Sequence, residues 1–121
     1  MKKTVGVDGC AGGWVSVAKQ GRRFRAGLHA TLEALWSAHA DAARILVDVP
    51  IGLPWAASPR RQVDFLARAR LGARRSSVFF TPLRETLAYE DYAAAREGLA
   101  RLAGLKPSKQ EWNILPKIRE A

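Results

Sequence analysis

Cysteine is almost absent from this chain of 121 residues, and long apolar runs are absent altogether. Cys10 is the only cysteine, so neither an intramolecular disulfide nor a cysteine-rich zinc site can form. No apolar stretch approaches the roughly 18 residues of a membrane-spanning helix. Asp8 and the glycines around it interrupt the N-terminal segment where a signal peptide would be apolar. These absences favour the cytoplasm, where thiols stay reduced.

Acidic residues are also scarce. The chain has 20 Lys and Arg against 11 Asp and Glu, which gives a net charge of +9. Such a balance favours an anionic partner, nucleic acid above all, although solvated surface arginines would give the same count. A hydrophobic content of 48% is ordinary for a soluble globular protein, and the length suits one domain over residues 1–121.

One carboxylate lies inside an apolar run. Residues 45–49 read Ile-Leu-Val-Asp-Val, and Pro50, Gly52 and Pro54 follow at once. A run of this kind predicts a short strand buried on both faces, which must end near the prolines. A buried carboxylate is costly unless it is paired, hydrogen-bonded or bound to a metal. Asp48 is therefore predicted at the C-terminal end of a buried strand, where open α/β sheets bind ligands.

The N-terminus repeats this arrangement, because residues 4–9 form a second run, rich in β-branched residues, that contains Asp8. If the two strands are parallel neighbours, Asp8 and Asp48 converge at one end of the sheet. Carboxylates about 4 Å apart repel by about 1 kcal/mol in water and about 4 kcal/mol at an effective dielectric near 20. Such a pair needs a shared proton or a hard cation such as Mg²⁺. The alternative is that each aspartate only caps a turn through nearby backbone amides.

The rest of the chain predicts a mixed α/β fold. Alternating residues predict strands at 14–19 and 24–28, which form an antiparallel meander with the first strand. Thr31 is expected to N-cap a helix that closes before the strand at 45–49. Further helices are expected from Ser58-Pro59 to Leu71, over 83–103 as one helix or two, and from Ser108 onward. His39 follows the apolar positions of the first helix and is expected to be structural.

Arginine is concentrated between positions 60 and 75. The only acid there is Asp64, which lies four residues from both Arg60 and Arg68, so a surface ion pair is its default role. The segment is predicted to contact nucleic-acid phosphates. Its arginines are Arg60, Arg61, Arg68, Arg70, Arg74 and Arg75.

Five groups of residues together resemble the uncharacterised bacterial and archaeal family described as predicted RNase-H-like nucleases. The resemblance covers nearly the whole chain, and its most specific block is Asp48 with the Pro-Ile-Gly-Leu-Pro segment after it. The groups are Val7-Asp8-Gly9-Cys10 with Gly13-Trp14, Val47 to Pro54, Asp64 with Arg68 and Gly72, Arg75 to Phe79, and Lys109-Gln110 with Trp112.

The resemblance implies an RNase H-like α/β core: three antiparallel strands, a helix, and a fourth strand parallel to the first. It places Asp8 on the first catalytic position of that fold, Asp48 on the strand-four position, and Asp64 on a further matching position. In such nucleases the carboxylates hold Mg²⁺ or Mn²⁺ for hydrolysis of phosphodiester bonds. Members of the family continue beyond residues 117–120 into another strand and helix with a further acidic motif. The chain is thus expected to match the N-terminal part of the pattern, with catalysis in doubt.

Two other functions stay open. The first is phosphate or nucleotide binding of the actin-like ATPase kind, with Gly9, Gly12 and Gly13 forming the phosphate loop. The second is a non-catalytic basic module that holds nucleic acid. The missing strand has a further consequence, because it would leave the strand at 45–49 with an unpaired edge. A homodimer through that edge is expected.

Overall fold

The computed structural model describes residues 1–121 as two compact units. The sheet unit comprises residues 1–49 with 120–121, and the helical unit comprises residues 50–119. The single domain expected over residues 1–121 stays a prediction.

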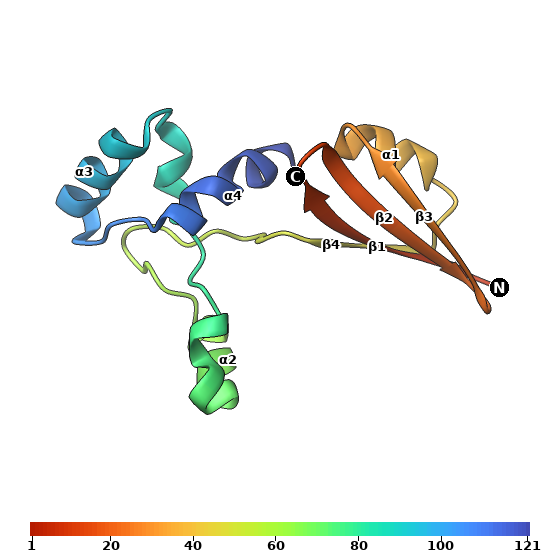
Figure 1. Cartoon of the computed structure of the whole chain (residues 1–121). Helices are drawn as coiled ribbons and strands as arrows, with labels where there is room; N and C mark the ends of the chain where they lie inside the picture. The colour runs from red at the N-terminus through yellow and green to blue at the C-terminus, as the bar shows by residue number, and fades with distance from the viewer. The chain divides into compact units, whose positions relative to one another are not determined.

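The sheet unit contains four strands in the spatial order β3-β2-β1-β4 (Figure 1). Strands β1 (Lys3–Cys10), β2 (Gly13–Gln20) and β3 (Arg23–His29) form an antiparallel meander. Strand β4 (Arg44–Asp48) pairs in parallel with β1. The predicted mixed sheet, three antiparallel strands and then a parallel fourth, is confirmed.

Helix α1 (Leu32–Ala38) packs against one face of this sheet (Figure 1). It begins as predicted, because Thr31 Oγ1 accepts a hydrogen bond from the Ala34 backbone N–H at 3.1 Å. It ends at Ala38, before β4 as predicted, and the chain then joins the sheet, where the Ala43 N–H donates to the Lys3 carbonyl at 2.9 Å. The core between helix and sheet consists of Val5, Val7, Trp14, Ala18 and Leu35.

Strand β4 is an edge strand, which corrects the expectation that both of its faces are buried. Ile45 and Val47 pack against the core, whereas Leu46 is 57% exposed and Asp48 is also exposed. The apolar run misled because residue type alone cannot show how many layers cover a sheet. Asp48 is therefore not a buried carboxylate, and the cost expected from its burial does not arise.

The helical unit contains two 3-10 helices and three α-helices. Its buried residues include Leu83, Thr86, Ala95, Leu99 and Leu115. Side chains cap the starts of two of these helices. Asp91 accepts a hydrogen bond from the Ala93 N–H at 2.9 Å, and Ser108 Oγ accepts one from the Glu111 N–H at 3.1 Å. The elements are α2 (Gln62–Leu71), η1 (Gly72–Ser77), η2 (Arg84–Ala88), α3 (Tyr92–Ala103) and α4 (Lys109–Glu120).

Helix α2 departs most from its prediction. It begins at Gln62 instead of Ser58, because the Ser58 N–H closes a turn onto the Trp55 carbonyl at 2.9 Å. It ends at Gly72 as predicted. Its apolar residues Val63 and Leu66 do not form a core face, since Val63 is 58% and Leu66 is 62% exposed.

Two neighbouring residues of α1 test the packing of the sheet unit. Leu35 is fully buried, whereas Trp36 is 57% exposed. Leu35→Ala is expected to lower the free energy of unfolding by about 2–5 kcal/mol, because it leaves a cavity in the core. Trp36→Ala, a larger deletion on the outer face, is expected to change it by about 0.5 kcal/mol or less. Urea unfolding of both variants measures the difference, and equal losses would contradict this core.

The free edge of β4 generates a second prediction. Strand β4 has β1 as its only neighbour in the sheet, so the backbone groups on its other side have no strand partner. An exposed strand edge pairs with another chain unless it is blocked. We propose that two copies of the chain pair edge to edge through β4, and light scattering at micromolar concentration is expected to give the mass of a dimer.

Leu46→Lys places a charge on the exposed side of the edge strand and keeps its backbone groups, so it is expected to give a monomer. Leu46→Val keeps an apolar side chain at this position and is expected to stay a dimer. A monomeric parent chain that remains fully soluble would contradict the pairing.

Candidate functional site

The two aspartates singled out in the sequence lie side by side. Asp8 is the register partner of Asp48 in the parallel pair of β1 and β4, so both side chains point to the same face of the sheet. Neighbouring strands are about 4.8 Å apart, so the two aspartates start from backbones separated by about that distance. The predicted convergence on adjacent parallel strands is confirmed. Both residues are exposed, on the face opposite to α1.

Backbone constraints fix both strand ends. After Asp48 the Val49 N–H turns back to the Val47 carbonyl at 3.1 Å, and Pro50 has no N–H to continue the ladder. Beyond Asp8 the chain turns tightly into β2 at Gly13, which has φ 137°. A Cβ there would lie 2.1 Å from the carbonyl oxygen of His29, so only glycine lets the turn approach the end of β3.

The pair has the chemistry of a partial Mg²⁺ site. Mg²⁺ is typically held by one or two carboxylates and keeps several of its waters. Asp8 and Asp48 supply this minimum and nothing more, since no group of three or more His, Cys, Asp or Glu side chains in residues 1–121 is arranged to hold a metal. Glu33 adds no ligand, because it lies on α1 over the opposite face of the sheet.

Asp64 belongs to the helical unit and forms an ion pair there. Its Oδ1 accepts from Arg61 Nη2 at 2.9 Å and its Oδ2 accepts from Arg61 Nε at 3.0 Å. The ion pair expected from the sequence is present, although the partner is Arg61 and not Arg60 or Arg68. Asp64 is buried, with 6% exposure. To bind a metal its carboxylate would have to leave this two-pronged contact, which is a strong one for a buried acid.

The arginine segment divides into two sets. Arg60 lies over the Phe80 ring at 4.1 Å, and Arg68 both lies over that ring at 5.1 Å and donates to the Val78 carbonyl at 2.7 Å. The side chains of Arg60, Arg61 and Arg68 are therefore all engaged in contacts within the helical unit. The other three are exposed, and their side chains make no hydrogen bond or ion pair within the chain: Arg70, Arg74 and Arg75.

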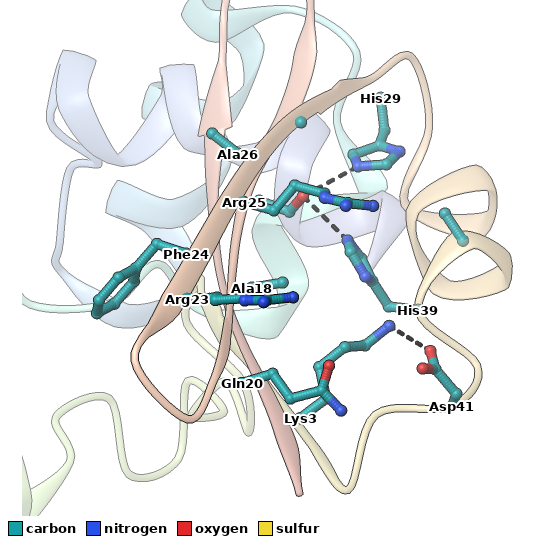
Figure 2. Close-up of a pocket in the computed structure, with 13 residues that line it drawn as sticks. Lys3, Ala18, Gln20, Arg23, Phe24, Arg25, Ala26, His29, His39 and Asp41 are labelled. Atoms are coloured by element: carbon teal, nitrogen blue, oxygen red, sulfur yellow. Dashed lines mark hydrogen bonds and ion pairs between the residues drawn. The ribbon is translucent and has the colours of Figure 1, made fainter. Parts of the chain in front are cut away.

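One polar cluster was not predicted. The Ser16 hydroxyl is 1% exposed and lies 3.0 Å from His29 Nε2 and 3.1 Å from His39 Nε2 (Figure 2). His39 was expected to be structural because no histidine lies near it in the sequence, yet the sheet brings the two rings to 5.6 Å. Alternation along the strands could have indicated the contact between Ser16 and His29. Ser16 lies two residues from Trp14 and therefore on the same face of the sheet, and Trp14 is the register partner of His29.

No helix of the structure is long and apolar enough to cross a membrane. Among known proteins, a family model described as "Protein of unknown function (DUF429)" matches residues 6–121 of the chain. Searches of curated proteins and of solved structures found no match.

The unpartnered arginines generate a prediction about salt. Each neutralised phosphate of duplex DNA contributes about −0.9 to the slope of log affinity against log salt. Replacing both Arg74 and Arg75 by Ala is expected to make the slope less steep by about 1.8, because two contacts are lost. Fluorescence anisotropy with a random duplex at several salt concentrations measures it.

Arg101→Ala removes the same kind of charge from α3, where Arg101 pairs with Glu97 at 2.7 Å, and serves as the control. It is expected to leave the slope unchanged. A salt-independent affinity, or equal effects of all variants, would contradict an interface at this segment.

Proposed function

Because the chain belongs to this DUF429 family, whose description assigns no activity, we propose its function from its own residues: Mg²⁺-dependent hydrolysis of phosphodiester bonds in nucleic acid, carried out in the cytoplasm. The observation that carries the proposal is the pairing of Asp8 with Asp48 on adjacent parallel strands. This is the end of an α/β sheet at which ligands bind. An RNase H-like origin for the sheet is part of the same proposal and is supported by its strand order.

In this proposal Asp8 and Asp48 are the ligands of the cation. A bound Mg²⁺ or Mn²⁺ would activate water and stabilise the charged oxygens of the phosphate undergoing displacement. The two carboxylates keep the cation at the strand ends, and their exposure leaves its remaining positions open to water and to phosphate oxygens. Arg70, Arg74 and Arg75 would hold the nucleic-acid backbone by charge, without reading its sequence.

The small number of carboxylates limits the expected rate. Nucleases that use two metal ions clamp both the attacking and the leaving oxygen, which takes more ligands than one aspartate pair provides. Asp64 is a weaker candidate for a metal ligand than Asp8 or Asp48, because Arg61 donates hydrogen bonds to both of its carboxylate oxygens. We therefore expect cation binding to be easier to detect than hydrolysis in residues 1–121.

A second function is favoured by a specific observation, the three unpartnered arginines. They would allow the chain to bind nucleic acid as a basic module even where the aspartates do not support hydrolysis. The two functions differ in their requirement for Asp8 and Asp48, which only hydrolysis needs.

The test is cation binding at the aspartate pair. Mn²⁺ added to the isotopically labelled full chain is expected to broaden backbone NMR signals around residues 8 and 48 before any others, because paramagnetic broadening falls steeply with distance. Asp8→Asn and Asp48→Asn are each expected to weaken Mn²⁺ binding about tenfold or more, since each removes one of two charged ligands.

Glu33→Gln also removes one exposed acid from the sheet unit and is expected to leave Mn²⁺ binding unchanged. Cleavage of a labelled oligonucleotide with Mg²⁺ is followed in parallel. If Mn²⁺ broadens signals elsewhere first, or if Asp8→Asn and Glu33→Gln bind it equally well, the metal site and the proposed hydrolysis are both rejected.

A further inference from the structure

A pocket of about 660 Å³ lies in the sheet unit, on the face of the sheet that α1 covers only in part. The start of β1, the β2–β3 hairpin and the residues after α1 line it. It exists because α1 ends at Ala38 and leaves the hairpin end of this face without a helix above it. Its volume lies within the roughly 300–1,000 Å³ typical of small-molecule sites.

The charged groups of this pocket are mostly cations. Lys3, Arg23 and Arg25 line it together with a single acid, Asp41, which forms an ion pair with Lys3. Figure 2 shows Arg23, Arg25 and Lys3 extending toward the side on which His39 lies. Neither arginine side chain makes a hydrogen bond or an ion pair within the chain, and both residues are exposed. The formal charge of the four groups is three minus one, or +2.

Beside these cations lies the Ser16 cluster. The Ser16 hydroxyl can donate to one imidazole while it accepts from the other, so both of its contacts at 3.0 and 3.1 Å are satisfied. The other ring nitrogen of His39, Nδ1, is buried and has no hydrogen-bond partner. A buried imidazole nitrogen without a partner costs free energy, and the His39 ring is held in place by its Ser16 contact at the edge of the pocket.

We propose that this pocket binds a small molecule through its phosphate monoester group, held by Arg23 and Arg25 with the His29–Ser16–His39 cluster beside it. Two guanidinium groups match the charge of a monoester, which is about −1.5 to −2 near neutral pH, better than that of a backbone diester. The site is separate from the proposed cation site, since Asp8 and Asp48 lie on the other face of the sheet.

Titration of His39 supports the same assignment. Burial lowers the pKa of His39 below its ordinary value, the positive charges of Lys3 and His29 lower it further, and Asp41 opposes them. A bound dianion would raise this pKa, so protonation and anion binding would favour each other. Affinity for a dianion is then expected to increase as the pH falls and His39 becomes protonated. The charged and titratable groups around the pocket are Lys3, Arg23, Arg25, His29 and Asp41.

The experiment is calorimetric titration of the full chain at physiological ionic strength with adenosine monophosphate, inorganic phosphate and adenosine. A chelator is present throughout, so failure of the aspartate metal site does not affect the result. The double variant R23Q/R25Q is compared with R22Q/R44Q, which removes the same charge from two exposed arginines outside the pocket. All four positions are exposed, so both variants are expected to fold, which circular dichroism checks.

The parent chain and R22Q/R44Q are expected to bind both phosphates and not adenosine. R23Q/R25Q is expected to bind them about a hundredfold more weakly, about tenfold for each lost charge-assisted hydrogen bond. Absence of phosphate binding, equal weakening of the two double variants, or equal affinity for adenosine would overturn the proposal. Tighter binding of an oligonucleotide without terminal phosphates would also overturn it, since the ligand group would then be a diester.

The pH dependence is measured with sulfate, which remains a dianion over this range, so only the protein titrates. Sulfate affinity is expected to rise as the pH falls in the parent chain and to lose that rise in His39→Gln. NMR titration of the His39 ring in the parent chain gives the same answer without a variant, as an upward pKa shift when sulfate is added. An unchanged His39 pKa on saturation with sulfate would overturn the placement of the anion beside it.

Discussion

The pairing of β1 with β4 is the constraint on which the sheet unit depends. These strands lie 40 residues apart in the sequence at their aspartates, and their register alone brings Asp8 beside Asp48. The same register presents Ile45 and Val47 to the core, where they pack with Val5 and Val7. A slip of one residue would move both apolar residues to the open face and separate the acids. The core and the candidate site are therefore fixed by one set of backbone hydrogen bonds.

The opposite faces of this sheet have different chemistry. The face with Asp8 and Asp48 presents carboxylates and suits a cation, whereas the helix-covered face presents Arg23, Arg25 and two imidazoles near the hairpin and suits an anion. Alternation of side chains along the strands keeps the two sets apart, because successive residues point to opposite faces. A basic chain can in this way hold a negatively charged site within one four-stranded sheet.

The sequence predicted the elements of the sheet unit well, because each has a local signal. Alternation marked the strands, and Thr31 marked the start of α1. The convergence of Asp8 and Asp48 also followed from the sequence, once parallel pairing was assumed. The exposure of β4 did not, since an apolar run is the same whether one or two layers cover it. The start of α2 was missed because Ser58 closes a turn, and the Ser16 cluster was missed because it joins three distant elements.

Strand β4 is hydrogen-bonded to a neighbour on one side only, and Asp48 is its last residue. The ends of edge strands open locally at a much lower free energy than a whole domain unfolds. Each opening here would carry Asp48 away from Asp8, and a cation held by both would have to be released first. The cation would thus stabilise the end of the sheet in proportion to its differential affinity for the closed form. Amide hydrogen exchange at the end of β4 would therefore report on whether a cation is bound between Asp8 and Asp48, independently of any reaction there.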